Sequence, residues 1–333
     1  MTQTALPTFL RLCADLAPYS YGQNFQDVFA LWAAGIRRTG WFVEFGALGG
    51  INVSNSYLLE CLGWSGVVAE PHPGFHEQLR ANRRCHVSTE CVWTETGKTV
   101  TFQAVRGRPA LSTIAGLDYD DVQSQSGARD NHVLHEVPTI SLVDLLRSCD
   151  APVEIDLLSI DTEGSELPIL QAFDFSAYRF GAIVVEHGHS SQRVPLHRLL
   201  TGHGYVRLWP ELSDHDDWYL HASRFDAPAA DSTAMAGLIA ALEKTKPTPG
   251  SGERYRRLGR FAAAQGLSDL ALLCAERAAL ALGATNAVVL VEHGKALAAS
   301  GQLVHAAQVY RAALALDPAQ ATARAALQRL TSA

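Results

Sequence analysis

Residues 41–73, WFVEFGALGGINVSNSYLLECLGWSGVVAEPHP, decide the fold. An apolar run at 41–45 predicts a strand, which a glycine turn follows. A helix is expected from residue 51, and a second apolar run, which predicts another strand, ends in Glu70. The glycines let a ligand approach the backbone closely, because no Cβ stands in the way. Glu70, about twenty residues beyond the turn, can accept hydrogen bonds from both hydroxyls of a ribose. The stretch therefore predicts a cofactor site.

Short apolar runs alternate with helical stretches beyond this segment as well. This alternation predicts an α/β domain whose sheet carries helices on both faces. The runs at 155–160 and 182–186 are nearly all apolar, which is typical of central strands. The expected strands are 41–45, 66–70, 86–92, 100–104, 155–160, 182–186, 205–209 and 218–221.

The chain changes character near residue 230. Its 333 residues favour two domains. All six tryptophans lie between Trp32 and Trp218, and the C-terminal part is rich in alanine. The segment KPTPGSG at 246–252 is typical of a linker. We expect a first domain at 1–230 with a helical N-terminal segment at 1–40, a linker at 231–252, and a helical domain at 253–333.

The C-terminal part repeats itself with an offset of 35 residues, which aligns Leu258-Gly259, Gly266, Ala271 and Ala278 with His293-Gly294, Gly301, Ala306 and Ala313. Small residues at helix-packing positions, with a glycine between two helices, resemble the tetratricopeptide repeat (TPR). The resemblance implies a small all-α domain of two helix pairs and a final helix. Such helices would bind a protein partner, form a homo-oligomer interface, or only extend the fold.

Composition excludes several classes of protein. The formal net charge of -7 lacks the basic excess of nucleic-acid-binding proteins. No apolar run is long enough to cross a bilayer, and the N-terminus does not resemble a signal peptide. Six scattered cysteines without a CxxC pair suit reduced thiols and argue against structural zinc. We therefore expect a cytoplasmic protein without nucleic-acid partners or a membrane span.

The pattern of the glycine turn indicates which class of cofactor would bind. Its pattern, E-x-G-x-x-G-G from Glu44, differs from the G-x-G-x-x-G dinucleotide fingerprint, which cradles a pyrophosphate. It resembles motif I of the Rossmann-like class I methyltransferases that use S-adenosylmethionine (SAM). We favour SAM over NAD, since an acid suits the cationic end of SAM.

Five ordered blocks extend this resemblance over the N-terminal 225 residues. They are GQNFQDVF (22–29), residues 41–73, VPTISLVDLL (137–146), IDLLSIDTEGSELPILQAFDF (155–175) and IVVEHG (183–188). Together they resemble the FkbM family of methyltransferases. Three positions depart from the family pattern: Glu44 replaces an aspartate, Leu48 replaces an asparagine, and Gly22 replaces a serine. We expect the missing amide at Leu48 to remove one polar contact to SAM.

The resemblance assigns residues to the parts of SAM. Glu44, Gly46 and Ala47 would surround the methionine end, covered by Gln23 and Asp27, for which helix capping is the alternative. Glu70 would bind the ribose, and Cys91-Val92 would flank the adenine. The complete set of candidate cofactor-binding residues is Gln23, Asp27, Glu44, Gly46, Ala47, Gly50, Ser54, Glu70, Pro71, Cys91, Val92 and Asp161.

Polar groups at the ends of two central strands suggest the catalytic chemistry. Asp161 follows one strand, and Glu186-His187 follow the next. In a metal-free site His187 would be the general base and Asp161 would contact substrate or SAM. In the alternative, Asp161, Glu186 and His187 would bind a divalent cation that lowers the pKa of the acceptor hydroxyl.

Nearby acidic residues and loops have plainer interpretations. At least one of Glu163 and Glu166 is expected as an acid at a helix N-terminus, and Asp216 and Asp217 as turn residues. Residues 105–136 are polar and lack periodicity, and a loop of this length is typically functional or disordered. We interpret it as an acceptor-binding lid.

The family resemblance implies a SAM-dependent O-methyltransferase that acts on a hydroxyl of a sugar, glycan or polyketide-like natural product. The alternative is a catalytically inactive methyltransferase fold that serves, with its TPR-like helices, as a scaffold.

Overall fold

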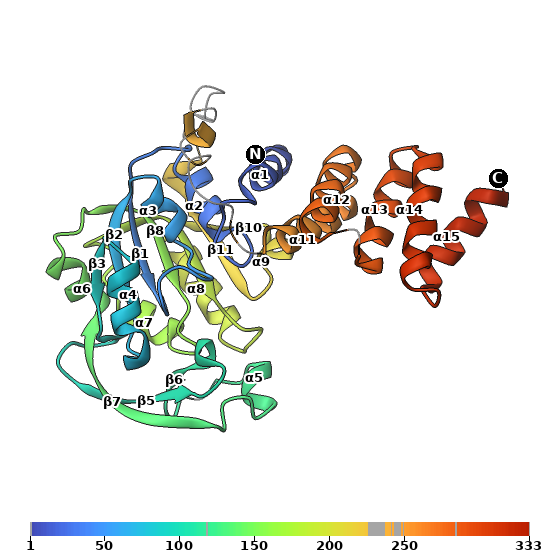
Figure 1. The fold of residues 1–333 in the computed structure, drawn as a ribbon. Coiled ribbons are helices and arrows are strands. Elements are labelled where there is room, and N and C mark those ends of the chain that lie inside the picture. The colour runs from blue at the N-terminus through green and yellow to red at the C-terminus, as the bar shows by residue number, and fades with distance from the viewer. Residues whose placement is uncertain are drawn as a thin grey trace. The chain divides into compact units, whose positions relative to one another are not determined.

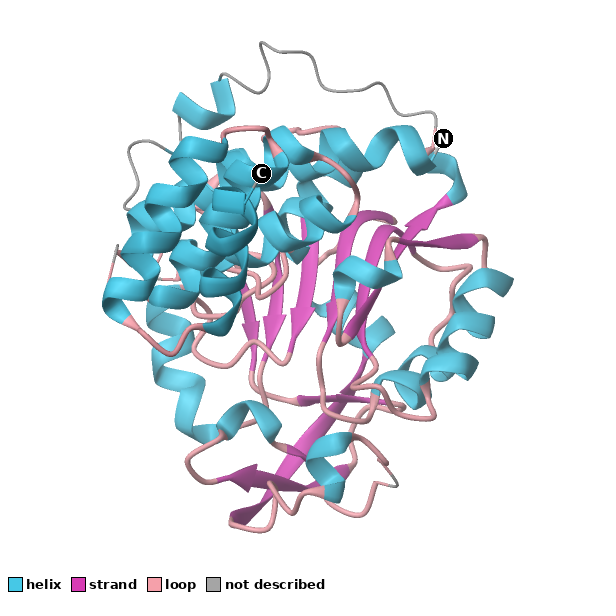
Figure 2. Ribbon diagram, turned by 90° about the vertical axis from the view of Figure 1, so that its right-hand side faces the viewer, coloured by secondary structure: helices cyan, strands magenta, loops and turns pink. Residues whose placement is uncertain are grey.

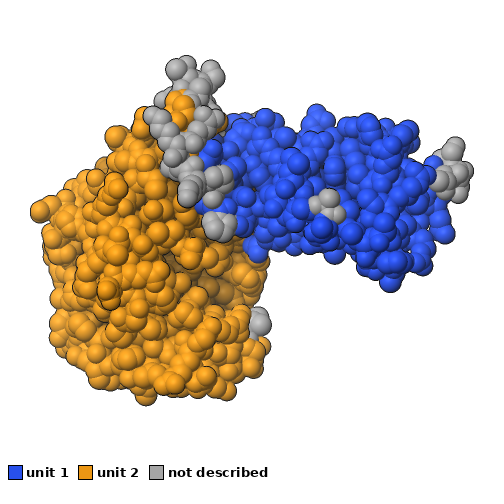
Figure 3. Space-filling model, in the orientation of Figure 1, with its two compact units in different colours: residues 1–20, 245–333 blue, residues 21–244 orange. Residues whose placement is uncertain are grey.

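The computed structural model describes residues 2–117, 119–225, 237–240, 242, 248, 250–283 and 285–332. Figure 1 follows the chain from the strands of its first two thirds to the helices near its C-terminus. The chain forms two compact units, coloured separately in Figure 3. Unit 2 comprises residues 21–244, and unit 1 comprises residues 1–20 together with 245–333.

Unit 2 is built on a seven-stranded sheet with the order β10-β11-β9-β8-β1-β2-β3. Neighbouring strands from β9 to β3 are parallel, whereas β11 is antiparallel to both of its neighbours. The strands are β1 (Trp41–Phe45), β2 (Ser65–Ala69), β3 (His86–Ser88), β8 (Glu154–Ile160), β9 (Arg179–Glu186), β10 (Tyr205–Leu208) and β11 (Asp216–His221). The N-terminal domain is therefore mixed α/β, as the alternation of apolar runs predicts.

Helices cover both faces of this sheet (Figure 2). Successive side chains of a strand point to opposite faces. On β11, Tyr219 packs in the same core as Leu196 and Leu200 of α8, while Trp218 stacks on Phe29 of α2 with 5.0 Å between ring centroids. The helices of unit 2 are α2 (Gln26–Ala33), α3 (Tyr57–Cys61), α4 (His76–Asn82), α5 (Val122–Gln125), α6 (Leu142–Ser148), α7 (Glu166–Ala172), α8 (Arg193–Gly202) and α9 (Pro210–Ser213), with short 3-10 turns η1 (Pro73–Phe75), η2 (Pro109–Leu111) and η3 (Ala222–Arg224).

A second sheet of four strands borders the segment interpreted as a lid and includes part of it. Its order is β4-β7-β5-β6, with β4 (Cys91–Trp93), β5 (Thr99–Val105), β6 (Thr113–Ile114) and β7 (His132–Ser141). Two expectations need correction. The strand expected at 86–92 is divided between β3 and β4, and residues 105–136 contain β6, α5 and the start of β7. Polar side chains on the less buried face of β7 and Pro138 within it hide this strand in the sequence.

Unit 1 is all-helical in the residues that the structure describes. It contains α1 (Thr2–Leu16), α11 (Ser251–Ala264), α12 (Ser268–Leu282), α13 (Ala287–Ala299), α14 (Leu303–Leu316) and α15 (Ala321–Ser332). Close packing explains two repeated glycines. A Cβ on Gly259 would lie 3.1 Å from the Cβ of Cys274, and one on Gly294 would lie 2.6 Å from the ring of Tyr310. No helix among the described residues is long and apolar enough to cross a bilayer.

The N-terminal helix α1 packs with the C-terminal helices, so residues 1–20 of the expected N-terminal segment 1–40 belong to unit 1, whereas residues 21–40 belong to unit 2. The carbonyl oxygens of Ala14 and Ala17 accept hydrogen bonds from Arg277 (2.9 Å) and Arg254 (3.1 Å). Phe9 and Leu10 are fully buried. The expected boundary near residue 230 lies outside the described residues.

Candidate functional site

The candidate site lies where the direction of the chain through the sheet reverses. From β1 the sheet continues to β2 and β3 on one side and to β8 and β9 on the other. Ligands of open α/β sheets bind beyond the carboxyl ends of the strands at such a point. A cavity of about 250 Å³ is found there. Its lining includes Gln23, Gln26, Glu44, Gly46, Leu48, Asn55, Glu70, Pro71, Cys91, Val92, Ser112, Asp121, Ser159, Asp161, Glu163, Glu186, His215 and Asp216.

Gly46 allows the ends of β1 and β8 to approach each other. Its φ is +85°, and a Cβ at this position would lie 1.8 Å from the carbonyl oxygen of Asp161. Any other residue would clash with the backbone of the neighbouring strand. The sequence predicts that a ligand approaches this glycine; in the structure the group that approaches it is the backbone of Asp161.

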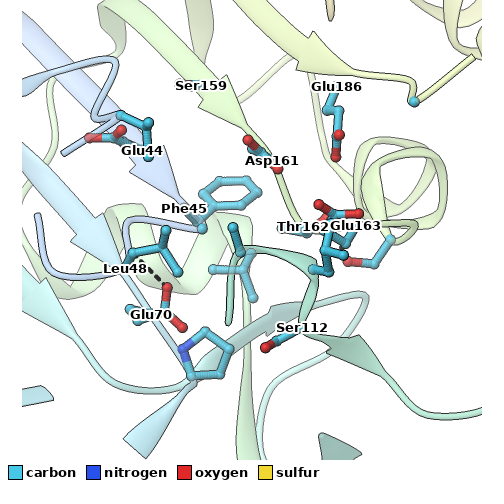
Figure 4. A pocket seen from close by; sticks show the side chains of 18 of the residues that line it. Glu44, Phe45, Leu48, Glu70, Ser112, Ser159, Asp161, Thr162, Glu163 and Glu186 are labelled. Carbon is cyan, nitrogen blue, oxygen red and sulfur yellow. Dashed lines mark hydrogen bonds between the residues drawn. The ribbon is translucent and has the colours of Figure 1, made fainter. Parts of the chain in front are cut away.

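Glu70 lies across the cavity from Asp161 (Figure 4). Its carboxylate accepts hydrogen bonds from the backbone N–H groups of Leu48 (2.7 Å, dashed in Figure 4) and His72 (2.8 Å). Burial, opposed by these bonds and assisted by the negative charge of Asp161, raises the pKa of Glu70 to about 7. Each carboxylate oxygen keeps a second lone pair for a ligand. Pro71, Cys91 and Val92 line the cavity too, as expected.

Glu44 organises the chain that follows the glycine turn. Its carboxylate accepts hydrogen bonds from the hydroxyls of Ser54 (2.8 Å) and Ser56 and from the backbone N–H of Asn55 (2.7 Å). Arg83 forms a buried ion pair with it at 3.4 Å. These bonds hold residues 51–56 in a non-helical conformation, so the helix expected from residue 51 begins only at Tyr57.

Three candidates near this turn do not line the cavity in the structure. Ser54 bonds to Glu44, a Cβ on Gly50 would meet Leu79 and Arg83, and Ala47 is buried beside the turn. They support the cavity wall and do not face the space within it.

Asn55 is a site residue that sequence reasoning missed. It lines the cavity, is only 7% exposed, and donates a hydrogen bond from Nδ2 to Ser159 Oγ at 3.0 Å. Among the described residues, its Oδ1 has no hydrogen-bond partner although the atom is buried. A buried acceptor without a partner is costly, and a ligand in the cavity would satisfy it.

The N-terminal segment contributes differently from expectation. Gln23 lines the cavity and is exposed. Asp27 is buried outside the lining and accepts hydrogen bonds from the backbone N–H groups of Tyr21 (2.7 Å) and Gly22 (3.2 Å), so it holds the turn before α2 and does not occupy the N-cap position of that helix, which is Phe25. Gln26 lines the cavity instead, and its Nε2 donates to Asp216 Oδ2 at 2.6 Å.

Acidic side chains gather at the ends of β8, β9 and β11. Asp161, Glu163 and Glu186 each offer a carboxylate oxygen within 4.8 Å of the others, and they point into the same part of the cavity (Figure 4). Burial raises the pKa values of Asp161 and Glu186, and raises that of Glu163 to about 8. Asp216 is not a turn residue: it begins β11 opposite Glu186, and burial raises its pKa to about 7.

His187 lies away from this group. Its imidazole is buried outside the cavity lining, where Nδ1 accepts a hydrogen bond from the backbone N–H of His189 and Nε2 lies 3.7 Å from Asp217. Burial lowers its pKa to about 4. Glu186 and His187 are consecutive residues, and consecutive side chains at a strand end point to opposite sides. This position does not support His187 as the base, and Glu163 replaces it in the cluster of possible metal ligands.

A family comparison agrees with this geometry. The sequence model described as the methyltransferase FkbM domain matches residues 44–221, which is more than half of the chain. The chain belongs to the FkbM methyltransferase family. No curated protein gives a significant match. The match begins at Glu44 and ends with β11, so the cavity of this FkbM domain is built almost entirely from matched residues.

The lid segment of the FkbM domain packs over the acidic residues. Arg129 forms buried ion pairs with Asp121 (2.7 Å) and Glu163, and the hydroxyl of Thr113 donates to the carbonyl of Glu163 at 2.7 Å. The ring of Tyr119 lies against Gly164, where a Cβ would be 2.7 Å from it. Glu166, by contrast, serves as the expected helix N-terminal acid and accepts from the backbone N–H groups of Thr162 and Gly164. These contacts fix the segment against Glu163 and Gly164, which follow β8.

Proposed function

We propose that this FkbM-family protein is a SAM-dependent O-methyltransferase. The observation that carries the proposal is that one cavity is lined by Glu70 at one end and by Asp161, Glu163 and Glu186 at the other. A carboxylate between two strand ends suits a ribose diol, and the carboxylates opposite suit the positive charges of a sulfonium cofactor. The reversal of strand order at β1 and β8 supports a Rossmann-like sheet.

The residues present fit this cofactor. Gly46 lines the cavity, and Asn55 Oδ1 is a buried acceptor that lacks a partner among the described residues. In the proposal, Glu70 binds the ribose, Pro71, Cys91 and Val92 flank the adenine, and Asn55 receives the ammonium group of the methionine end. SAM supplies a methyl group on a positively charged sulfur, which leaves readily as a thioether.

Residues of the chain would do the rest of the chemistry. The acceptor hydroxyl must lose a proton as the methyl group is transferred, because the pKa of an alcohol lies far above 7. Asp161 and Glu186 are the carboxylates that face the cavity next to each other, so we assign the base to this pair. The lid residues Ser112 and Asp121 line the same space and would orient the acceptor. By family resemblance, the acceptor is a sugar, glycan or polyketide-like compound.

We further propose that the helices of unit 1 are TPR-like and bind a partner or a second copy of the chain. The 35-residue offset returns in the structure, since α12 begins at Ser268 and α14 at Leu303. Gly259 and Gly294 allow each helix pair to pack closely.

Isothermal titration with SAM tests the proposal. The wild-type protein should bind in the micromolar range, whereas Glu70→Ala should lose about 1–3 kcal/mol and Asn55→Leu a smaller amount. Glu95→Ala, which changes an exposed acid outside the cavity, is the matched control. Activity is then read by mass shift on a panel of nucleotide sugars and glycans. Absence of binding at millimolar SAM would refute the proposal and favour the inactive scaffold.

A further inference from the structure

The acidic cluster of unit 2 gathers more carboxyl groups than the neighbouring basic side chain can pair with. Asp161, Glu163 and Glu186 converge within 4.8 Å, and Asp216 stands opposite Glu186 in the sheet. The buried cation beside them is Arg129, which is shared between Glu163 and Asp121. Carboxylates that are withdrawn from water without a counter-charge are strongly unfavourable. Such groups stay protonated or take up a cation, and a positively charged group that enters through the cavity would stabilise their ionised forms.

Unpartnered polar atoms mark the place of that group. Among the described residues, Glu186 Oε2 is a buried atom without a hydrogen-bond partner. The hydroxyl of Tyr119 is a second one, and this residue is only 7% exposed. The hydroxyl lies against Gly188, two residues beyond Glu186, where a Cβ would be 2.4 Å away. Of the charged neighbours that raise the pKa of Tyr119, Glu186 acts most strongly, followed by Glu166 and Glu163. The lid thus places a buried hydroxyl without a hydrogen-bond partner beside the turn that follows Glu186.

The chemistry of these groups selects the ligand. Three carboxylate oxygens and a neutral hydroxyl are hard donors, which favour Mg²⁺, Mn²⁺ or Ca²⁺ over softer metals. Three protein carboxylates leave further coordination positions open for water or an acceptor oxygen on the cavity side. No thiol lies among the three ligands, and His187 is turned away from them.

We propose that Asp161, Glu163 and Glu186 bind one divalent cation of the Mg²⁺, Mn²⁺ or Ca²⁺ type, with the Tyr119 hydroxyl close to it. The site differs from the sequence-based expectation, in which His187 took the place of Glu163. Two of its ligands, Asp161 and Glu186, are the carboxylates assigned above to the base, so the site rests on the proposed function and deepens it: a cation held there would lower the pKa of the acceptor hydroxyl. Its ligands come from the turn after β8 and the end of β9 and need no SAM to assemble.

A second group of possible ligands provides the internal control. His189, Asp214 and His215 also lie within 4.8 Å of one another, but all three are exposed. Exposed side chains of this kind are commonly solvated without a metal, and the structure gives them no unpartnered buried atom. Asp214 does not line the cavity, so Asp214→Asn disrupts this group without touching the acidic cluster.

The test is a titration of the full chain with Mn²⁺ alone, without SAM, read by the electron paramagnetic resonance signal of free Mn²⁺. The wild-type protein should bind one equivalent below about 1 mM. Glu186→Gln, which keeps size and removes charge, should weaken binding at least about tenfold, and Glu163→Gln should do the same. Asp214→Asn should bind like the wild type. Mg²⁺ and Ca²⁺ should compete for the same equivalent.

Thermal unfolding distinguishes a variant that has lost metal binding from one that does not fold. Mn²⁺ should raise the melting temperature of the wild type and of Asp214→Asn but not that of Glu186→Gln, and two separate glutamine variants guard against one that fails to fold. The proposal is overturned by absence of Mn²⁺ binding, by unchanged affinity in both glutamine variants, or by loss of binding in Asp214→Asn. A separate SAM titration of the metal-free protein shows whether the proposed function stands independently.

Discussion

A change of pH from 8 to 6 should weaken SAM binding through Glu70. In the ligand-free protein burial raises the pKa of this carboxyl to about 7. Ribose hydroxyls donate hydrogen bonds, so they prefer the ionised carboxylate and lower its pKa when they bind. The group therefore releases a proton on binding, and affinity rises with pH through the ligand-free pKa.

The magnitude follows from the fraction of protein that is ready to bind. With a pKa of about 7, Glu70 is roughly 90% ionised at pH 8 and roughly 10% ionised at pH 6. If the protonated form binds negligibly, Kd rises about tenfold over this range, equivalent to about 1.4 kcal/mol. The same shift has the opposite sign for folding. The unfolded chain ionises first, so Glu70 costs the ligand-free protein stability as pH rises from about 4.5 to 7.

Calorimetric titration at pH 6, 7 and 8 measures the effect on the wild type and on Glu70→Gln. The glutamine variant should bind SAM more weakly at pH 8 and should lose the tenfold dependence on pH. Burial also raises the pKa values of Asp216 and Glu163, to about 7 and about 8, so the difference between the two proteins isolates Glu70. Equal slopes in both proteins, or a wild-type affinity that does not change with pH, would refute the assignment of the ribose to Glu70.

Three further predictions concern stability. Gly46→Ala places a Cβ 1.8 Å from a backbone oxygen and should lower the free energy of unfolding in urea by more than about 3 kcal/mol. The control Gly97→Ala, at a glycine with φ +79° and open space around it, should lower it by only about 1–2 kcal/mol. Arg129→Met leaves two buried carboxylates without their partner and should cost about 3–5 kcal/mol, measured in the same way. A chain of residues 21–244 should be soluble and monodisperse in size-exclusion chromatography, whereas residues 1–231 should aggregate because α1 lacks its packing partners. A well-behaved 1–231 protein would contradict the division into units.

Local signals in the sequence predicted the parts of the fold that depend on them. β1 runs from Trp41 to Phe45 as expected, because an apolar run there meets a glycine turn. β7 was missed, since its exposed face carries polar side chains and Pro138 lies within it. The membership of α1 in unit 1 was missed because it depends on hydrogen bonds between residues far apart in the chain, such as Arg277 and Ala14.

In the candidate site, too, local sequence patterns identify only the residues that do not depend on contacts between distant parts of the chain. Glu70 and Asp161 end strands that are visible in the sequence, so they were found. Asp216 reaches the cavity only because β11 inserts antiparallel beside β9 and brings it opposite Glu186, and no local pattern reports that register. Asn55 faces the cavity because Glu44 holds its segment out of a helix. For His187 a usable signal existed: it directly follows Glu186, and two consecutive side chains at a strand end do not face the same side.

The packing of α1 against α11 and α12 affects how the protein is made. Ala17 and Arg254, which share a hydrogen bond, are 237 residues apart. At a synthesis rate of about 5–20 residues per second, roughly 12–47 s pass between the appearance of the two partners on the ribosome. During that interval the intervening unit can fold, while the apolar side of the first helix waits for helices that do not yet exist. Slower translation of the middle of the message would lengthen this exposure. We therefore expect a chaperone to bind α1 during synthesis.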